Sequence, residues 1–181
     1  MKQIENKKIV TNLLIFAGIV YVLLMLFIII FKSLSSPLDL FTGNHPDYRS
    51  VNLIPFKDIW ISTVSEGVNK SNIIGNIILF IPFSIFIRTI RTNMKNGLVK
   101  SIGIVFIVSI IIEIIQFVFS IGVSDINDVI LNTFGGMVGS IIYSTLSKFI
   151  KKNTLKSFVA IVSSLIAFIM LILFILIFLA N

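Results

Sequence analysis

The chain has 181 residues, of which 56% are hydrophobic and only 13% are charged. Its mean hydropathy of +1.06 lies outside the range of ordinary soluble domains and predicts an integral membrane protein. The sequence contains no cysteine, which excludes disulfides, thiolate metal sites and cysteine nucleophiles.

Five hydrophobic stretches approach the roughly 20 residues that an α-helix needs to cross a bilayer. They are residues 9–31, 72–90, 98–121, 128–149 and 158–180. The connections between them are polar, and no internal repeat is strong. We therefore predict an all-α fold, a bundle of five transmembrane helices that forms a single integral membrane domain over residues 1–181.

The placement of basic residues predicts the orientation of the bundle. Most of the 15 Lys and Arg residues lie in the amino-terminal tail and in the connections that follow the second and fourth stretches. By the positive-inside rule these segments are cytoplasmic, so the amino terminus is expected inside and the carboxyl terminus outside. The net charge of +7 is thus interpreted as a topology signal, and no nucleic-acid partner is expected.

The long connection between the first two stretches is expected to lie outside. It places Ile59, Trp60, Thr63 and Val64 at helical spacing, which predicts an amphipathic helix at the outer interface. Arg49 precedes this segment and has two interpretations of equal weight. It either folds back toward acidic side chains or a bound phosphate, or makes an ordinary contact with solvent and lipid headgroups.

Polar side chains recur at helical spacing within the third and fourth stretches. The third stretch carries Ser109, Glu113, Gln116 and Ser120. The fourth carries Asp128, Asn132, Gly135 and Gly139, with Asp125 just before its start. Because each set falls on one helical face, we expect the two faces to pack against each other.

The second stretch adds Asn76 and Pro82 to this group. Pro82 has no backbone N–H, so the carbonyl of Ile78 loses its helical partner. Gly135 and Gly139 form a GxxxG pair, which lets another helix backbone approach closely. We expect Asn76 to converge with the polar residues of the third and fourth stretches in the outer half of the bundle.

Glu113 is the most costly of these polar residues. A charge near the bilayer centre costs about 2.5–3.5 kcal/mol on insertion scales, and helix rise places Glu113 about 12 Å below the outer end at Ile121. It is expected to be protonated, paired with an amide side chain, or solvated from an outward cavity. Asp125 and Asp128 also suit simple capping of a helix amino end.

Four sequence motifs resemble those of the VanZ-like family of small bacterial membrane proteins. They are NLIPF at 52–56, GNIILFIPF at 75–83, EIIQ at 113–116 and DINDVILNTFGGMVG at 125–139. The resemblance covers about residues 49–143. It departs from the family pattern at Gly122, Val123 and Ser124, where many members carry a basic residue.

The resemblance implies a bacterial plasma-membrane protein with a role in the cell envelope or in glycopeptide susceptibility. The founding member of the family is associated with low-level resistance to teicoplanin and related lipoglycopeptides, which bind cell-wall precursors outside the membrane. The partners it implies are membrane lipids and a lipid-linked cell-wall precursor or lipoglycopeptide. The candidate ligand-binding residues are Arg49, Asn76, Glu113, Gln116, Asp125, Asp128 and Asn132.

Two function classes stay open at this point. The first is a nonenzymatic protein whose outward polar pocket binds a lipid-linked or amphipathic molecule. The second is an intramembrane enzyme in which Glu113 or Asp128 acts as general acid or base on a lipid or polyprenyl-phosphate headgroup. A proton-coupled transporter is less favoured, because no inverted repeat is evident.

The structural alternative is that these polar groups only join helices by hydrogen bonds. We favour that interpretation for Asn76, Gln116 and the glycines, and a functional one for Glu113 and Asp128. No metal-ligand cluster or phosphate-cradling glycine loop is found in the sequence, so neither a metal nor a cofactor is expected. The sequence does not predict the oligomeric state.

Overall fold

The computed structural model describes residues 2–31, 50–56 and 66–180. The elements in this part of the chain are α1 (Lys2–Phe31), β1 (Val51–Asn52), α4 (Glu66–Ile90), α5 (Gly97–Val118), β2 (Ser124–Asp125), α6 (Ile126–Phe149) and α7 (Lys152–Ala180). All five of these helices are long and apolar enough to cross a membrane. The predicted all-α membrane bundle is therefore confirmed.

The membrane spans follow the predicted hydrophobic stretches. The candidate spans are Lys8–Ile30, Asn72–Ile90, Gly97–Val118, Ile126–Phe149 and Lys152–Ile169. Helices α4 and α7 begin six residues before the predicted stretches, because polar residues at their amino ends continue the helix. The predicted interfacial helix of Ile59 to Val64 lies outside the described residues.

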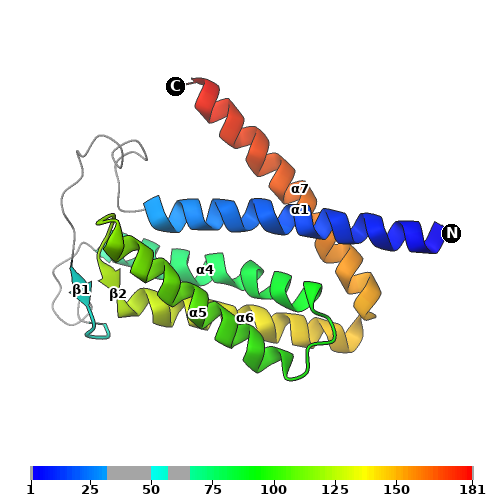
Figure 1. Cartoon of the computed structure of the whole chain (residues 1–181), viewed down its shortest axis with the longest axis horizontal. Coiled ribbons are helices and arrows are strands. Elements are labelled where there is room, and N and C mark those ends of the chain that lie inside the picture. Colours follow the sequence, from blue (N-terminus) through cyan, green and yellow to red (C-terminus); the bar gives the residue numbers. More distant parts are fainter. Residues whose placement is uncertain (1, 32–49, 57–65, 181) are drawn as a thin grey trace.

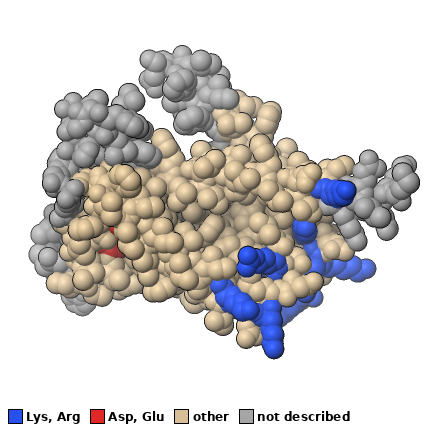
Figure 2. Space-filling view, in the orientation of Figure 1, with Lys and Arg blue, Asp and Glu red and all other residues tan. Residues whose placement is uncertain are grey.

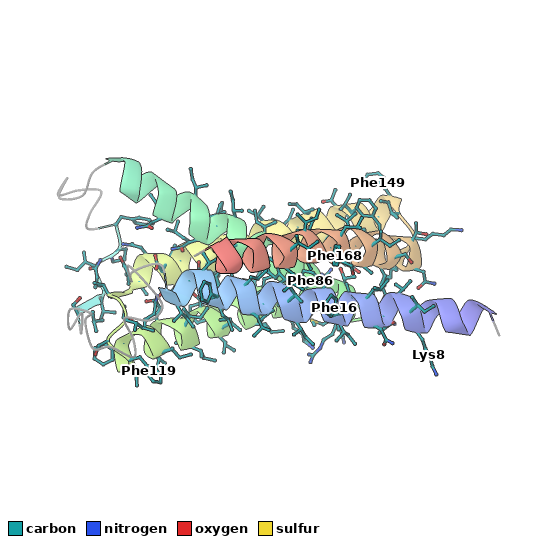
Figure 3. The ribbon with its side chains drawn as sticks, turned by 90° about the horizontal axis from the view of Figure 1, so that it is seen from above. Lys8, Phe16, Phe86, Phe119, Phe149 and Phe168 are labelled. Atoms are coloured by element: carbon teal, nitrogen blue, oxygen red, sulfur yellow. The ribbon has the colours of Figure 1, made fainter. Side chains whose placement is uncertain are left out.

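The described helices pack as two connected groups (Figure 1). Helix α6 packs closely against α4 and also against α5, while α1 packs against α7 and more lightly against α4. Lys8 and Phe119 lie at opposite ends of the bundle (Figure 3). Large apolar side chains such as Phe16 and Phe168 remain exposed, as expected for helices whose solvent is lipid.

The end of α5 differs from the sequence prediction. The helix ends at Val118, where the hydrophobic run to Ile121 predicted three more residues. Ser120 has a φ of 57°, its N–H donates to the Phe117 carbonyl, and the Ile121 N–H donates to the Gln116 carbonyl. These bonds form a Schellman turn, which closes the helix without the usual glycine. Ser120 is consequently buried in a turn and does not extend the polar helical face.

The GxxxG pair places α4 and α6 backbone to backbone. A Cβ added to Gly135 would lie 2.3 Å from the Ile77 carbonyl oxygen, and one added to Gly139 would lie 2.2 Å from the Ile81 carbonyl oxygen. The close approach predicted for these glycines is confirmed. The expectation that they face α5 is wrong, however. They face α4, and the neighbouring Gly136 faces α5 instead.

Helices α5 and α6 are antiparallel and pair in a regular register. The Ser101 hydroxyl donates to the Ser140 hydroxyl at 2.8 Å, and the Asn132 side-chain amide donates to the Ser109 hydroxyl at 2.8 Å. Between these pairs, Gly136 lies against the side chain of Val105. Each step moves four residues forward on α5 and four back on α6. Continuing it by one step brings Glu113 of α5 level with Asp128 of α6.

Candidate functional site at the carboxylate end

A short parallel strand pair links the first connection of the chain to the start of α6. In this pair Val51 lies opposite Ser124 and Asn52 lies opposite Asp125, and the Ser124 N–H donates to the Ser50 carbonyl at 3.0 Å. The pair holds the NLIPF motif beside the amino end of α6. The sequence predicted no strand here, because two-residue strands have no periodicity of their own.

Asp125 closes the amino end of α6. Its carboxylate accepts hydrogen bonds from the Asn127 backbone N–H at 2.9 Å and from the Asn52 side-chain amide at 3.3 Å. The first of these bonds is an N-cap, one of the two interpretations that the sequence left open. Burial raises the pKa of the Asp125 carboxyl above its ordinary value, the Asn127 N–H opposes this shift, and the charge of Asp128 adds to it.

Glu113 reaches the same helix start from α5. Its Oε2 accepts a hydrogen bond from the backbone N–H of Asp125 at 2.8 Å, and its side chain is only 5% exposed. The carboxylate therefore lies at the amino end of α6, where the helix dipole favours negative charge. Because α5 ends at Val118, Glu113 lies about 7.5 Å of helix rise from that end, less than the predicted 12 Å.

Asp128 joins α6 to α4 one turn further along. Its Oδ1 accepts a hydrogen bond of 2.6 Å from the side-chain amide of Asn76, and both side chains are buried. A hydrogen bond to a carboxylate is stronger than one between neutral groups, so this contact fixes how the two helices meet. The predicted convergence of Asn76 with the acidic start of α6 is present in the structure.

Asn132 and Gln116 lie apart from the carboxylates and contact different helices. Asn132 donates to Ser109, deeper between α5 and α6. Gln116 instead donates its amide to the carbonyl of Ile29 at 3.0 Å. That carbonyl is among the last four of α1, which have no partner within their own helix. Gln116 thus caps α1, which matches the structural interpretation given to it.

Two residues that sequence reasoning missed complete the arrangement. The Asn127 side-chain oxygen accepts a hydrogen bond from the Phe56 N–H at 2.6 Å, and Asn52 contacts Asp125 as described. Both belong to the NLIPF and DIND motifs, and their polarity beside apolar neighbours was the available signal. Arg49 lies outside the described residues. We use the name carboxylate end for the region of Asn52, Asn76, Glu113, Asp125, Asn127 and Asp128.

Opposite charges lie at opposite ends of the described bundle (Figure 2). The acidic side chains at the carboxylate end are Glu113, Asp125 and Asp128. The basic side chains at the other end are Lys8, Arg88, Arg91, Lys95, Lys100, Lys148, Lys151, Lys152 and Lys156. Among the described residues, no group of three or more His, Cys, Asp or Glu side chains is placed to hold a metal ion.

Comparison with known proteins identifies the family of the chain. The family profile described as VanZ/LLP1 matches residues 16–152. The chain is also 32% identical over 153 residues to Protein VanZ of Enterococcus faecium, covering 84% of this chain and 86% of that protein. The chain belongs to the VanZ family. No solved structure gives a significant match.

Membership of the VanZ family confirms the resemblance seen in the four sequence motifs. The matched residues 16–152 contain every described residue of the carboxylate end. Together with the five apolar helices, this membership makes the chain a multi-pass membrane protein of the VanZ type.

Proposed function

We propose that this chain is a bacterial plasma-membrane protein that lowers susceptibility to glycopeptide antibiotics of the teicoplanin type. It does so by binding a lipid-linked or amphipathic envelope molecule at the carboxylate end. One observation carries the proposal: α4, α5, α6 and the NLIPF segment all contribute polar side chains to this one end. The bonds of Glu113 to Asp125 and of Asn76 to Asp128 join these segments.

The separation of charge supports an outward position for this site. Nine described Lys and Arg side chains lie at the opposite end of the bundle, and the positive-inside rule assigns that end to the cytoplasm. The amino terminus is then inside and the carboxyl terminus outside. The carboxylate end faces the compartment in which glycopeptides meet cell-wall precursors.

A second candidate is an intramembrane enzyme that acts on a lipid or polyprenyl-phosphate headgroup. The pairing register of α5 and α6 favours it, because this register brings Glu113 level with Asp128. Two such carboxyls could divide the roles of general acid and general base, with Arg49 holding a phosphate. We prefer binding, because one oxygen of each carboxyl is already used in a bond that orders the helix ends.

The proposal is tested by removing charge while keeping these bonds. A glutamine at 113 and an asparagine at 128 still present an oxygen to the Asp125 N–H and to Asn76. We expect Glu113→Gln and Asp128→Asn to fold and insert normally but to lose the effect on teicoplanin susceptibility, measured in a bacterium lacking its own copy. Ser101→Ala, at a buried pair outside the carboxylate end, is the matched control. Retained resistance in both charge variants would contradict the proposal.

Binding and catalysis are separated with purified protein. The protein is incubated with labelled phospholipids and polyprenyl phosphates, and both the bound and the free lipid are analysed. Stoichiometric retention of unchanged lipid supports binding, whereas repeated turnover that Glu113→Gln abolishes supports the enzyme.

A further inference from the structure

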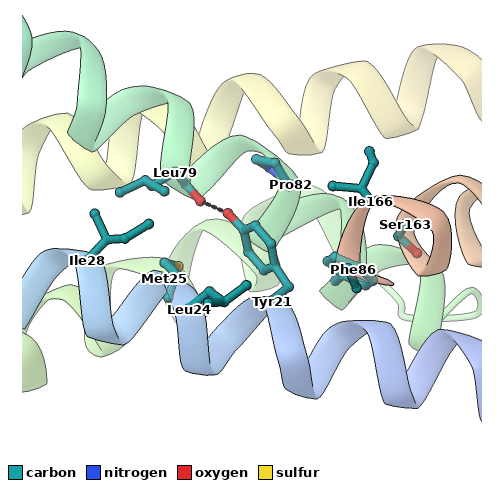
Figure 4. Close-up of a pocket in the computed structure, with 10 residues that line it drawn as sticks. Tyr21, Leu24, Met25, Ile28, Leu79, Pro82, Phe86, Ser163 and Ile166 are labelled. Atoms are coloured by element: carbon teal, nitrogen blue, oxygen red, sulfur yellow. Dashed lines mark hydrogen bonds between the residues drawn. The ribbon is translucent and has the colours of Figure 1, made fainter. Parts of the chain in front are cut away.

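An apolar cavity lies between α1, α4 and α7 (Figure 4). Its volume is about 200 Å³. The lining includes Tyr21, Met25, Ile28, Leu79, Pro82 and Ala167. This volume exceeds the roughly 30 Å³ occupied by one water molecule but is smaller than the 300–1,000 Å³ of pockets that enclose drug-sized ligands. It suits part of a single hydrocarbon chain.

The polar groups of the lining are used within the protein. The Tyr21 hydroxyl donates to the carbonyl of Leu79, and Figure 4 shows this bond among the residues that line the cavity. The Ser163 hydroxyl donates to the carbonyls of Val159 and Ala160 in its own helix, at 2.5 and 3.3 Å. With both hydroxyl groups engaged, the lining is suited to hydrocarbon. Cavities of this kind stay dry and take up apolar ligands.

The cavity lies within the membrane-spanning part of the helices. Its lining residues come from the candidate membrane spans Lys8–Ile30, Asn72–Ile90 and Lys152–Ile169. Lipid acyl chains are therefore the solvent at this depth. Pro82 of α4 is one of the lining residues, and its ring removes one backbone hydrogen bond from that helix.

The cavity also approaches the carboxylate end. Leu79, which lines the cavity, lies three residues from Asn76 on α4. About 4.5 Å of helix rise thus separates Leu79 in the apolar lining from Asn76 at the carboxylate end. An amphipathic lipid likewise has a polar headgroup directly beside its apolar chain.

We propose that the cavity holds one hydrocarbon chain of a membrane lipid whose headgroup lies at the carboxylate end. The inference rests on the proposed function for the position of the headgroup, and it names the chemical class of the ligand's tail. The site is a lateral groove that a lipid enters from the bilayer.

The experiment fills the cavity and measures bound lipid. Detergent-purified protein is mixed with phosphatidylglycerol and examined by native mass spectrometry. Ala167→Phe fills the cavity from a buried residue of α7, and Ile28→Trp fills it from a residue of α1 that is exposed toward lipid. Val162→Phe, on the exposed side of α7, is the control for added size.

We expect one lipid on the wild type and on Val162→Phe. In Ala167→Phe and Ile28→Trp the new side chain takes the space of about two methylene groups of the lipid. We expect these variants to retain lipid about tenfold more weakly. Equal retention in all four proteins, or none in the wild type, would overturn the proposal. A lipid-free dimer that Ile28→Trp dissociates would also overturn it, because a second copy would then cover the cavity.

The assay distinguishes this proposal from the proposed function. In one outcome, Glu113→Gln loses the antibiotic effect but still retains lipid, while Ile28→Trp loses the lipid. The cavity then binds a hydrocarbon chain independently of the headgroup site. In the other outcome, the wild type retains no lipid while Glu113→Gln still abolishes resistance. The proposed lipid site in the cavity is then wrong, and the proposed function of the carboxylate end is unaffected.

Discussion

The face of α6 toward α4 and its face toward α5 are both closely packed, but by different atoms. Toward α4, Gly135 and Gly139 lie against the backbone carbonyls of Ile77 and Ile81. Toward α5, contact is made by side chains, with Gly136 against Val105 and serine and asparagine hydroxyls and amides in hydrogen-bonded pairs.

This difference decides which face can adjust to a substitution. A side chain can change rotamer or be replaced by a smaller one, whereas a helix backbone moves only with the whole helix. The α4 face also positions Asn76 against Asp128, so a shift there alters the carboxylate end. The two faces should therefore differ in how strongly they respond to added volume and in whether a second mutation can restore them.

The largest effect is expected from Gly139→Ala. The new Cβ would lie 2.2 Å from the carbonyl oxygen of Ile81, so the two helices must separate. Overpacking of a tight contact costs about 1–3 kcal/mol, and a backbone contact should lie at the upper end of that range. The free energy of unfolding is measured in bicelles. Gly103→Ala, whose Cβ meets nothing within 4 Å, is the control and should lose no stability.

Equal stability of Gly139→Ala and Gly103→Ala would show that α4 and α6 do not approach as described. A second readout is available in the bacterium. On the proposed function, Gly139→Ala should also reduce teicoplanin resistance, because separating α4 from α6 lengthens the bond between Asn76 and Asp128.

An intermediate effect is expected from Gly136→Ala, and this variant tests the side-chain face. Its Cβ would lie 2.7 Å from both Cγ atoms of Val105, at a cost of about 1–2 kcal/mol. Combining it with Val105→Ala makes room, so the double mutant should recover about 0.5–1 kcal/mol relative to the sum of the single mutants. Ile81→Ala should give no such recovery with Gly139→Ala, because the obstacle there is a backbone oxygen. If the double mutants at Gly136 and Gly139 recovered the same free energy of unfolding, the α4 face and the α5 face would not differ in the way described.

The sequence predicted the helices of this fold because their signal is local. About twenty apolar residues specify a membrane helix wherever they occur, so the first four hydrophobic stretches closely match candidate spans and the fifth overlaps the span Lys152–Ile169. The spacing of Asp128 and Asn132 likewise predicted a face of polar side chains, although in the structure Asp128 bonds to α4 and Asn132 to α5. The end of α5 was predicted three residues late, because Phe119 and Ile121 continue the apolar run while Ser120 turns the backbone.

The parts that could not be predicted depend on contacts between distant segments. The pairing of Asn52 with Asp125 joins residues 73 positions apart, and nothing in either short motif specifies the other. Which neighbour the glycines face was also open, since a GxxxG pair permits a close approach by any helix. The bond from Gln116 to Ile29 depends on where α1 ends beside α5. Each of these is a choice of partner, which periodicity does not encode.

The smallest effect is expected from Ser101→Ala on the α5 face. The Ser101 hydroxyl donates to the Ser140 hydroxyl at 2.8 Å and also approaches the carbonyl of Leu98 at 2.9 Å. Hydrogen bonds between membrane helices contribute about 0.6 kcal/mol on average, so the loss should be of that order. A cycle with Ser140→Ala in the same bicelle assay isolates the pair. A loss as large as that of Gly139→Ala would mean that the hydrogen-bonded face is as unyielding as the glycine face. A loss near 0.6 kcal/mol would instead place most of the helix-to-helix specificity in the backbone contact with α4.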